Sequence, residues 1–567
     1  MFNVVILDGY SDEPAGLGVP PYLDVYPRYV AGAIKHVSRS AKIYYFTIDY
    51  VRKNLDTFLK VSSKSKLLIF LCGVSVPGKY IGGDPIKIDE IKLLSRLIKG
   101  PIKILGGPAA RFGFGIEGGR IAESSTIFSE DFDLIVKGDV ELVVYNFIKE
   151  GFSIEKVDPN IVRENYDLTS IFAVKGAFIV KMHPNYGLNL ICEIETYRGC
   201  PRYVVGGCSF CIEPLYGKVI YRPIEDVLRE IETLYSFGVR NFRIGRQADL
   251  YTYMAKDTGR MEFPKPNVRA IKRLFEGIRK VAPELDVLHI DNVNPGTIYH
   301  YPKESIKISK IIVENHTPGD VAAYGIESAD PRVIKANNLK VYPDEAFEAI
   351  KILNKVGGTR GWNGMPELLP GLNFVYGLMG ESKETYILNY EFLKKVLDEG
   401  LMVRRINIRQ VLPLPGTRMW RIGVRIIRKH RGIFKYYKEK IRREIDLPML
   451  RRVIPKKTVL KKAMTEKYVG NRTYARQVGS YPILIDIPMK LELNKYIDVF
   501  VINHGFRSIQ ALPYPIKINK LSLKCIKMLP IDSNTIIKII INRPFKNSED
   551  FRKKIGRIDL IEYLDFT

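Results

Sequence analysis

Three cysteines lie close together near the middle of the chain. Cys200, Cys208 and Cys211 fall within twelve residues, whereas the whole 567-residue chain has only six cysteines. A disulfide framework of the secreted kind is therefore excluded, and the clustering is typical of a metal site. Three thiolates on one loop can hold three irons of a [4Fe–4S] cluster and leave the fourth iron open. A structural zinc site would need a fourth protein ligand, and the nearest histidine is His183, so zinc is the weaker interpretation.

The cysteine segment directly follows a predicted strand, at the start of a long alternation of strands and helices. Strands are predicted at residues 190–196, 241–244, 286–290, 322–325, 371–376 and 405–410, and helices at 224–237, 268–281, 343–356 and 383–399. Such alternation is typical of parallel sheets. Six strands predict a partial (β/α)6 barrel of the TIM type over residues 186–425, with functional side chains at the carboxyl ends of the strands.

The first 165 residues carry a similar alternation. Short apolar runs at residues 2–8, 41–48, 66–71, 101–106 and 133–136 predict buried strands. We expect a Rossmann-like open parallel sheet over residues 1–165, with any ligand at the carboxyl ends of its strands. Residues 158–186 are polar and irregular, which predicts a linker or inserted strands between this domain and the barrel.

The cysteine motif resembles that of a known superfamily. Arg198-Gly199-Cys200-Pro201 and Cys208-Ser-Phe-Cys211 are similar to the signature loop of radical S-adenosylmethionine (SAM) enzymes. The usual loop has three residues between its first two cysteines, whereas this chain has seven, including Gly206-Gly207. Later segments resemble further motifs of the superfamily in chain order: residues 243–251, 323–328, 373–381 and 412–417.

The resemblance implies roles for particular residues. It makes Cys200, Cys208 and Cys211 the ligands of the [4Fe–4S] cluster and Phe210 a packing partner for the SAM adenine. Gly245, Gln247 and Asp249 would lie near the SAM amino group, and Glu327 and Ser328 near its ribose and methionine parts. The implied chemistry is one-electron cleavage of SAM to a 5′-deoxyadenosyl radical, with the electron from a ferredoxin or flavodoxin. Catalytic acids and bases stay unidentified; Cys72 and Cys525 are candidate participants, although buried structural roles fit them better.

The N-terminal segment resembles the cobalamin-binding-like domain that precedes many radical SAM barrels. The similarity lies in Gly18-Val-Pro-Pro21, Gly106-Gly107-Pro108 and Gly138-Asp139-Val-Glu141. No Asp-X-His-X-X-Gly motif supplies an axial histidine, so cobalamin remains an open alternative. Methylthiotransferases carry three N-terminal cysteines, whereas this segment has only Cys72, which argues against standard methylthiolation.

The C-terminal third is strongly basic. The chain has a net charge of +26, and residues 421–467 alone have 17 Lys and Arg against 4 Asp and Glu, or +13. We interpret residues 426–467 as a basic helical linker, 468–516 as a TRAM- or OB-like barrel and 517–567 as a helix-hairpin-helix-like module. Barrel candidates for RNA contact are Arg472, Tyr474, Arg476, Tyr481 and Arg507. In the last module Pro544-Phe545 and Ser548 would start a helix as staple and cap.

Taken together, these features predict an α/β multidomain radical SAM enzyme that acts as a transferase. Its substrate would be tRNA or rRNA, because a basic surface favours a polyanion, and the reaction a methylation or related modification. One alternative is a cobalamin-assisted radical SAM enzyme that acts on a small molecule or protein. Another is a non-catalytic, nucleic-acid-binding iron–sulfur protein. No signal peptide and no apolar run of membrane-spanning length are present, so we expect a cytoplasmic protein without a membrane partner.

Overall fold

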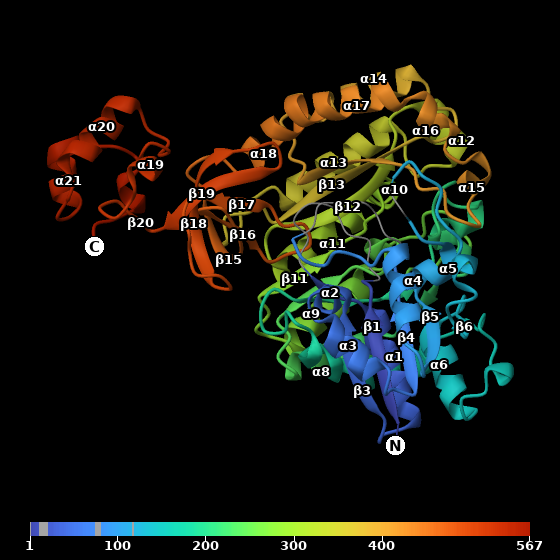
Figure 1. The fold of residues 1–567 in the computed structure, drawn as a ribbon. Coiled ribbons are helices and arrows are strands. Elements are labelled where there is room, and N and C mark those ends of the chain that lie inside the picture. Colours follow the sequence, from blue (N-terminus) through green and yellow to red (C-terminus); the bar gives the residue numbers. More distant parts are fainter. Residues whose placement is uncertain (1, 11–20, 74–80, 116–117) are drawn as a thin grey trace.

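The computed structural model describes residues 2–10, 21–73, 81–115 and 118–567. The N-terminal domain, the predicted barrel and the C-terminal modules follow one another along the chain. In Figure 1 the blue N-terminal domain lies below the green and yellow barrel, and the red C-terminal parts extend to one side. Residues 18–20, which belong to one of the cobalamin-domain motifs, lie outside the described residues.

The N-terminal domain is built on a parallel sheet, as predicted. The strands are β1 (Asn3–Asp8), β3 (Lys42–Thr47), β4 (Leu67–Leu71), β5 (Ile102–Gly106) and β6 (Leu134–Ile135). Their order is β3-β1-β4-β5-β6. The strand order therefore changes direction between β1 and β4, and ligands of such sheets bind at that point. The surrounding helices are α1 (Val25–Val37), α2 (Ile48–Lys53), α3 (Leu55–Ser62), α4 (Ile88–Leu97), α5 (Pro108–Phe112) and α6 (Val140–Lys149).

The segment predicted as a linker or inserted strands is helical, so that prediction was wrong. It forms α7 (Asp167–Gly176) and a 3-10 helix (Ala177–Met182). The buried face of α7 includes the polar residues Thr169 and Ser170, which hid the periodicity. Helices α1 and α7 also pack without space for a side chain, because a Cβ on Gly32 would lie 1.8 Å from the carbonyl oxygen of Phe172.

The six strands of the predicted barrel form two parallel sheets. They are β7 (Ile191–Ile194), β10 (Asn241–Ile244), β11 (Val287–Ile290), β12 (Asp320–Glu327), β13 (Leu368–Tyr376) and β14 (Arg405–Gln410). A parallel bridge between Asn292 and Ala323 joins the β7-β10-β11 and β12-β13-β14 sheets. A short strand from the N-terminal segment, β2 (Tyr22–Leu23), pairs with β7.

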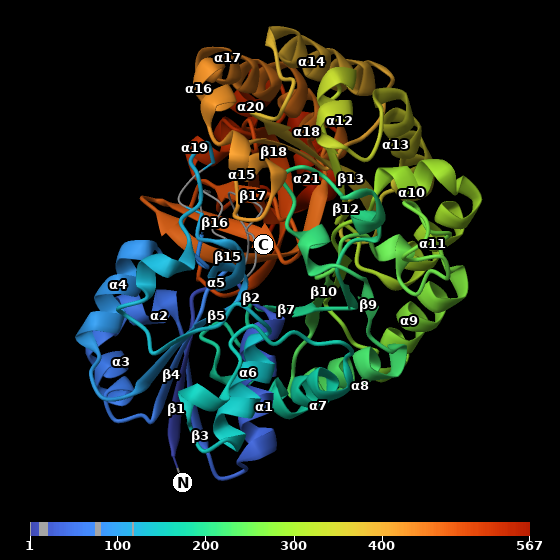
Figure 2. The ribbon, with the colours of Figure 1, turned by 90° about the vertical axis from the view of Figure 1, so that its right-hand side faces the viewer.

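Helices surround the barrel strands in an arc, as Figure 2 shows. They are α8 (Ile224–Ser236), α9 (Val268–Val281), α10 (Pro295–His300), α11 (Pro302–Asn315), α12 (Pro331–Asn337), α13 (Pro343–Gly357) and α14 (Lys383–Asp398). A buried ion-pair network joins this arc to the N-terminal domain. Arg28 of α1 and Arg222 both pair with Glu230 of α8, and Arg28 Nη2 lies 2.9 Å from Glu230 Oε1. The two domains are therefore joined by groups that cannot be separated without leaving buried charge unpaired.

The basic segment after the barrel is helical only in its first part. Helices α15 (Arg418–Ile422), α16 (Arg425–Lys429), α17 (Arg431–Ile441) and α18 (Leu447–Val453) are followed by strand β15 (Val459–Val469). The C-terminal barrel therefore begins at Val459 and not at residue 468. Its first strand is amphipathic, with Ala463 and Met464 buried against exposed lysines, and the lysine-rich sequence conceals this strand.

Five strands close the C-terminal barrel. The other strands are β16 (Arg472–Gln477), β17 (Leu484–Ile487), β18 (Tyr496–His504) and β19 (Ser508–Tyr514), in the closed order β15-β16-β17-β19-β18. A helical module follows with α19 (Leu523–Ile526), α20 (Ser533–Asn542) and α21 (Ser548–Ile555), and strands β20 (Ile516–Lys517) and β21 (Leu564–Asp565) pair beside it.

The N-terminus of α21 differs from the prediction. Asn547, not Ser548, caps the helix, because its side-chain oxygen accepts from the amides of Glu549 and Asp550. Asp550 also accepts from the amide of Lys546. These amides are thus engaged by the chain's own side chains. No helix in the described part of the chain has the length and apolar character needed to cross a membrane.

Candidate active site

The three cysteines lie on one loop at the carboxyl end of β7. The loop is closed at its base by an antiparallel pair, β8 (Tyr197–Arg198) and β9 (Ile220–Tyr221). The residues added between the first two cysteines form a 3-10 helix, Pro201–Val205. Gly206 and Gly207 then adopt positive φ angles of 79° and 60°, which reverse the chain toward Cys208. The seven-residue spacing is therefore a helical turn inserted within an otherwise compact loop.

Two cations lie beside the thiols. Arg202, in the inserted turn, donates from Nη1 to Cys208 Sγ at 3.0 Å. Burial lowers the pKa of Lys340, but the nearby cysteines and Glu327 outweigh this effect and raise its pKa overall. Burial raises the pKa of the Cys200 thiol to about 12, while Lys340 and Arg202 oppose that rise. The two cations favour negatively charged sulfur at this place.

This donor set fits an iron–sulfur cluster. Three thiols from one loop match the ligand number of a [4Fe–4S] cluster with one open iron, and the flanking cations suit its negative charge. When bound, the cluster and SAM supply one-electron cleavage of a carbon–sulfur bond and a hydrogen-abstracting radical. In the part of the chain that the structure describes, no three or more His, Cys, Asp or Glu side chains are grouped to hold a single metal ion.

The other candidate ligands lie elsewhere. His183 packs near the ring of Tyr45 on β3, and its Nδ1 accepts from the amide of Asn185 at 3.0 Å. It therefore belongs to the N-terminal domain and does not complete a zinc site. Cys72 is buried at the end of β4 and Cys525 is buried in α19, which agrees with structural roles for both.

A cavity of about 350 Å³ adjoins the cysteine loop at the carboxyl ends of the barrel strands. Four of the predicted SAM-contacting residues line it: Phe210, Gly245, Gln247 and Glu327. Cys211 also lines it, so the cavity reaches the cluster site. Other parts of the chain contribute as well, with Tyr26 and Gly118 from the N-terminal domain and Tyr481 from the C-terminal barrel.

The local structure explains why these residue types are required. Gly245 has no space for a side chain, because a Cβ there would lie 2.1 Å from Glu193 Oε1. Gln247 is held by its neighbours: Thr196 Oγ1 donates to its Oε1 at 3.1 Å, and its Nε2 donates to the carbonyl of Ile244 at 2.7 Å. Glu327 ends β12 at a bulge with a φ of 69°, a strained conformation for a residue with a side chain.

Two predicted SAM residues do not line the cavity. Asp249 is buried and caps the turn Leu250–Thr252, while Thr297 Oγ1 donates to its Oδ2 at 2.7 Å. Burial raises the pKa of Asp249 to about 6. Ser328 is also buried, where its hydroxyl accepts from the amide of Asp330 at 3.1 Å. Both side chains support the turns that carry Gln247 and Glu327.

A charged network from the N-terminal domain holds the strand that leads to the cysteine loop. Arg163 Nη1 donates to Glu195 Oε2 at 3.0 Å. Arg198, two residues before Cys200, pairs with Asp139 and donates to the carbonyl of Arg163 at 3.1 Å. Asp139 in turn accepts from the amide of Arg163 at 2.6 Å. The motif around Asp139 therefore positions the cluster loop.

The C-terminal barrel closes another side of the cavity through the loop between β16 and β17. Tyr481 donates from its hydroxyl to Asp291, at the end of β11, and Arg405 of β14 lies over its ring at 3.3 Å. The amide of Ser480 donates to His289 Nδ1 at 3.0 Å. Tyr481 is thus a cavity residue, and Arg476 is buried and paired with Glu466. Neither side chain is exposed on an outer face of the C-terminal barrel, where these two candidates for RNA contact were expected.

Sequence reasoning missed Arg202, Lys340, Arg163 and the cavity position of Tyr481. Arg202 alone had a local signal, since it lies between the first two cysteines. The others reach the site from distant parts of the chain, and no sequence spacing encodes such contacts.

Comparisons with known proteins found a matching family profile, sequence relatives and a solved structure. Residues 194–384 match the sequence profile of the Radical SAM superfamily. An uncharacterized protein of Methanocaldococcus jannaschii is 46% identical over 511 residues, which cover 89% of this chain and 92% of that protein. The tRNA-2-methylthio-N(6)-dimethylallyladenosine synthase of Fervidobacterium nodosum is 22% identical over 49% of this chain and 54% of its own length. The solved structure of TsrM, a radical SAM methyltransferase from Kitasatospora setae, aligns with a TM-score of 0.46 and 12% identity, covering 72% of this chain and 73% of that one.

The barrel, the cysteine loop and the matched profile together define the class of protein. This chain belongs to the radical SAM superfamily and is an enzyme of that superfamily. The non-catalytic alternative does not agree with this membership.

Proposed function

We propose that this radical SAM enzyme modifies an unactivated carbon of tRNA or rRNA, by methylation or a related C–H functionalisation. The observation that carries the proposal is a basic surface on helices α15–α18. These helices begin directly after the loop that carries the cavity residues Val411, Leu412 and Leu414. A polyanion bound to them would pass close to the cavity.

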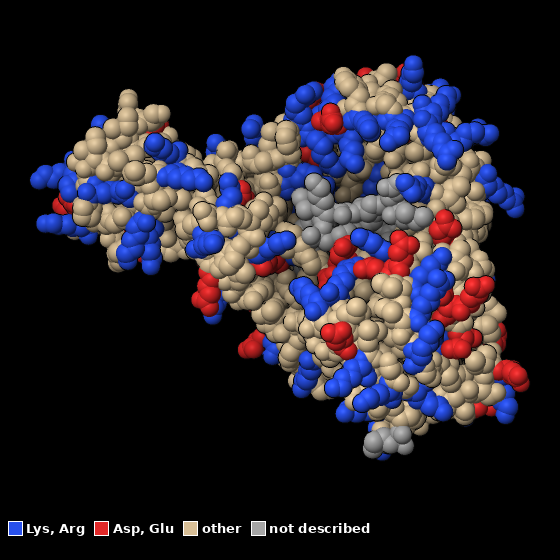
Figure 3. Space-filling model, viewed as in Figure 1, with Lys and Arg blue, Asp and Glu red and all other residues tan. Residues whose placement is uncertain are grey.

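The exposed side chains of this surface are almost all cationic. From residue 421 to 453 the exposed basic residues are Arg421, Arg425, Arg428, Lys429, Arg431, Lys435, Lys438, Arg443 and Arg451, whereas Glu439 is the exposed acid. In Figure 3 lysines and arginines gather over these helices and over the C-terminal module. The bacterial tRNA-modifying relative and the small closed barrel support the same substrate class. An electron carrier such as a ferredoxin or flavodoxin would supply the electron.

The test combines SAM cleavage with RNA binding. Anaerobically purified protein, reduced with dithionite, should cleave SAM to 5′-deoxyadenosine, and it should bind bulk tRNA with strong salt dependence. Replacing Arg428, Arg431 and Lys435 together with Gln should make the plot of log affinity against log salt shallower by about two to three units.

Matched substitutions at Lys60, Lys64 and Lys99, which are exposed on the N-terminal domain, should leave the salt dependence unchanged. Equal effects of the two triple variants would refute the RNA surface. Mass spectrometry of nucleosides from cells with and without the gene would then identify the modified RNA base or ribose.

A second candidate is a cobalamin-assisted reaction on a small molecule or protein. The specific observation is that Tyr26 and Gly118 of the N-terminal domain line the main cavity, so a cofactor bound by that domain would face the cluster loop. Incubation with hydroxocobalamin followed by gel filtration tests it. Retention of one cobalamin per chain, without retention of tRNA, would favour this candidate over the RNA substrate.

A further inference from the structure

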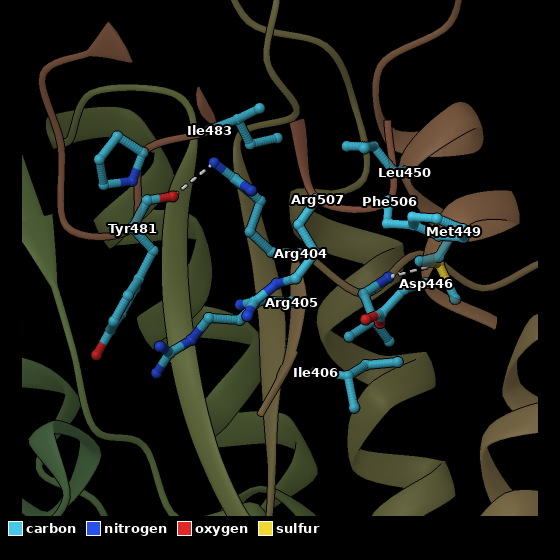
Figure 4. A pocket seen from close by; sticks show the side chains of 12 residues that line it. Arg404, Arg405, Ile406, Asp446, Met449, Leu450, Tyr481, Ile483, Phe506 and Arg507 are labelled. Carbon is cyan, nitrogen blue, oxygen red and sulfur yellow. Dashed lines mark hydrogen bonds between the residues drawn. The ribbon is translucent and has the colours of Figure 1, made fainter. Parts of the chain in front are cut away.

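A second, smaller pocket adjoins the main cavity at Arg405 and Tyr481. Its volume is about 80 Å³, and Arg405 and Tyr481 line both spaces. It forms where the start of β14, helix α18, the β16–β17 loop and the turn between β18 and β19 meet. Figure 4 shows the side chains of Arg404, Arg405 and Arg507 in this pocket, together with Asp446.

The pocket holds more positive charge than its own acid can balance. Asp446 is already paired with Arg442 of the preceding helical turn. Burial, and then the neighbouring Arg405, lowers the pKa of Arg404 to about 9. This shift reflects burial first and the repulsion from Arg405 second.

Some of the hydrogen-bonding groups in the pocket have no partner in the chain. Arg404 Nη2 donates to the carbonyl of Tyr481 at 2.7 Å, which fixes its side chain. Its Nε, however, and both Nε and Nη1 of Arg405 are buried without a hydrogen-bond partner. Leaving buried guanidinium donors unpaired is costly, and an anion with several acceptor oxygens would satisfy them together. A volume of about 80 Å³ exceeds the ~10–15 Å³ that one water needs and suits a tetrahedral oxyanion.

The structure assigns to this pocket the binding of a phosphate group of the substrate, held by Arg404, Arg405 and Arg507 beside the main cavity. The assignment of that phosphate to an RNA backbone rests on the proposed function. A phosphodiester in the pocket would lie close to the cavity, since Arg405 and Tyr481 line both spaces. The pocket would thereby position the neighbouring nucleoside toward the cluster loop.

The test uses the cluster-loaded full chain, with inorganic phosphate and bulk tRNA as separate probes. Arg507 is exposed in the turn between β18 and β19, so Arg507→Gln removes one cation without opening the core. Arg39→Gln, at an exposed residue just after α1 in the N-terminal domain, makes the same charge change elsewhere. Calorimetric titration at low salt should show one phosphate per chain, with binding about tenfold weaker in Arg507→Gln than in the control. Arg507→Lys should recover part of the affinity, because it restores the charge.

Each probe has its own overturning result. Equal phosphate affinity of Arg507→Gln and Arg39→Gln would overturn the assignment of a phosphate site to this pocket. If Arg507→Gln binds phosphate more weakly but tRNA with unchanged affinity, the bound phosphate group does not come from RNA. Absence of tRNA binding by the wild-type enzyme would refute the proposed function, whereas the phosphate titration would still decide the pocket.

Discussion

Arg163 provides the sharpest test of how the N-terminal domain controls the cluster loop. Its side chain is 2% exposed and lies between three carboxylates, those of Asp139, Glu141 and Glu195, each at most 5% exposed. Replacing Arg163 with Met keeps much of the apolar stem but leaves buried carboxylates facing each other. Breaking a buried network by removing one partner costs about 3–5 kcal/mol. We expect a loss of that size, concentrated in the segment that carries Glu195 and the cysteine loop.

An exposed ion pair offers a matched control. Arg229 pairs with Asp226 at 2.8 Å, but its side chain is 61% exposed, and such pairs contribute only about 0–1 kcal/mol. Hydrogen exchange over residues 195–211 and iron content after anaerobic reconstitution are the measurements. Arg163→Met should speed exchange in this segment and lower iron content, whereas Arg229→Met should change neither. The double variant with Glu195→Gln should recover part of the loss, because it removes one unpaired carboxylate.

The reasoning would be refuted if both single variants destabilised the chain equally. It would also be refuted if Arg163→Met lowered global stability while exchange at the cysteine loop and iron content stayed unchanged. In that case the buried network would hold the two domains together without positioning the cluster ligands.

Three further predictions concern the loop, the N-terminal sheet and a second cysteine. Gly207→Ala should abolish iron binding, since its Cβ would lie 2.2 Å from the Pro214 ring. Gly206→Ala, whose Cβ would have nothing within 4 Å, should cost only about 1 kcal/mol of stability for its positive φ. Iron analysis and thermal unfolding of the two variants measure this difference. Burial raises the pKa of Asp8 to about 7. The folded state therefore keeps a proton on this carboxyl group that the unfolded chain releases near pH 4. The free energy of unfolding should fall as the pH rises from about 4 to 7. Asp8→Asn should remove that fall and raise the melting temperature at pH 8 but not at pH 4, as scanning fluorimetry would show. Cys72→Ala should retain the full iron content, because this thiol is buried at the end of β4; loss of iron would contradict the assignment of the ligands.

The repeating elements of this fold were predictable from the sequence. Short buried runs ending in turns gave both parallel sheets, since a strand buried on both faces is apolar along its whole length. The prediction of α7 failed because Thr169 and Ser170 lie on its buried face. The boundary of the C-terminal barrel was misplaced because β15 alternates buried apolar residues with exposed lysines.

The sequence by itself determined that Cys200, Cys208 and Cys211 lie on one loop, because a short stretch of chain keeps its residues close together in space. Only the tertiary structure decided what surrounds them. Tyr481 meets Asp291 across 190 residues of sequence, and Arg163 meets Glu195 across 32. Charge pairing and packing between separate domains depend on how those domains dock, and the spacing of residues along the chain does not predict this docking. The cysteine loop is thus a property of its own short segment, whereas the cavity beside it is a property of three domains packed together.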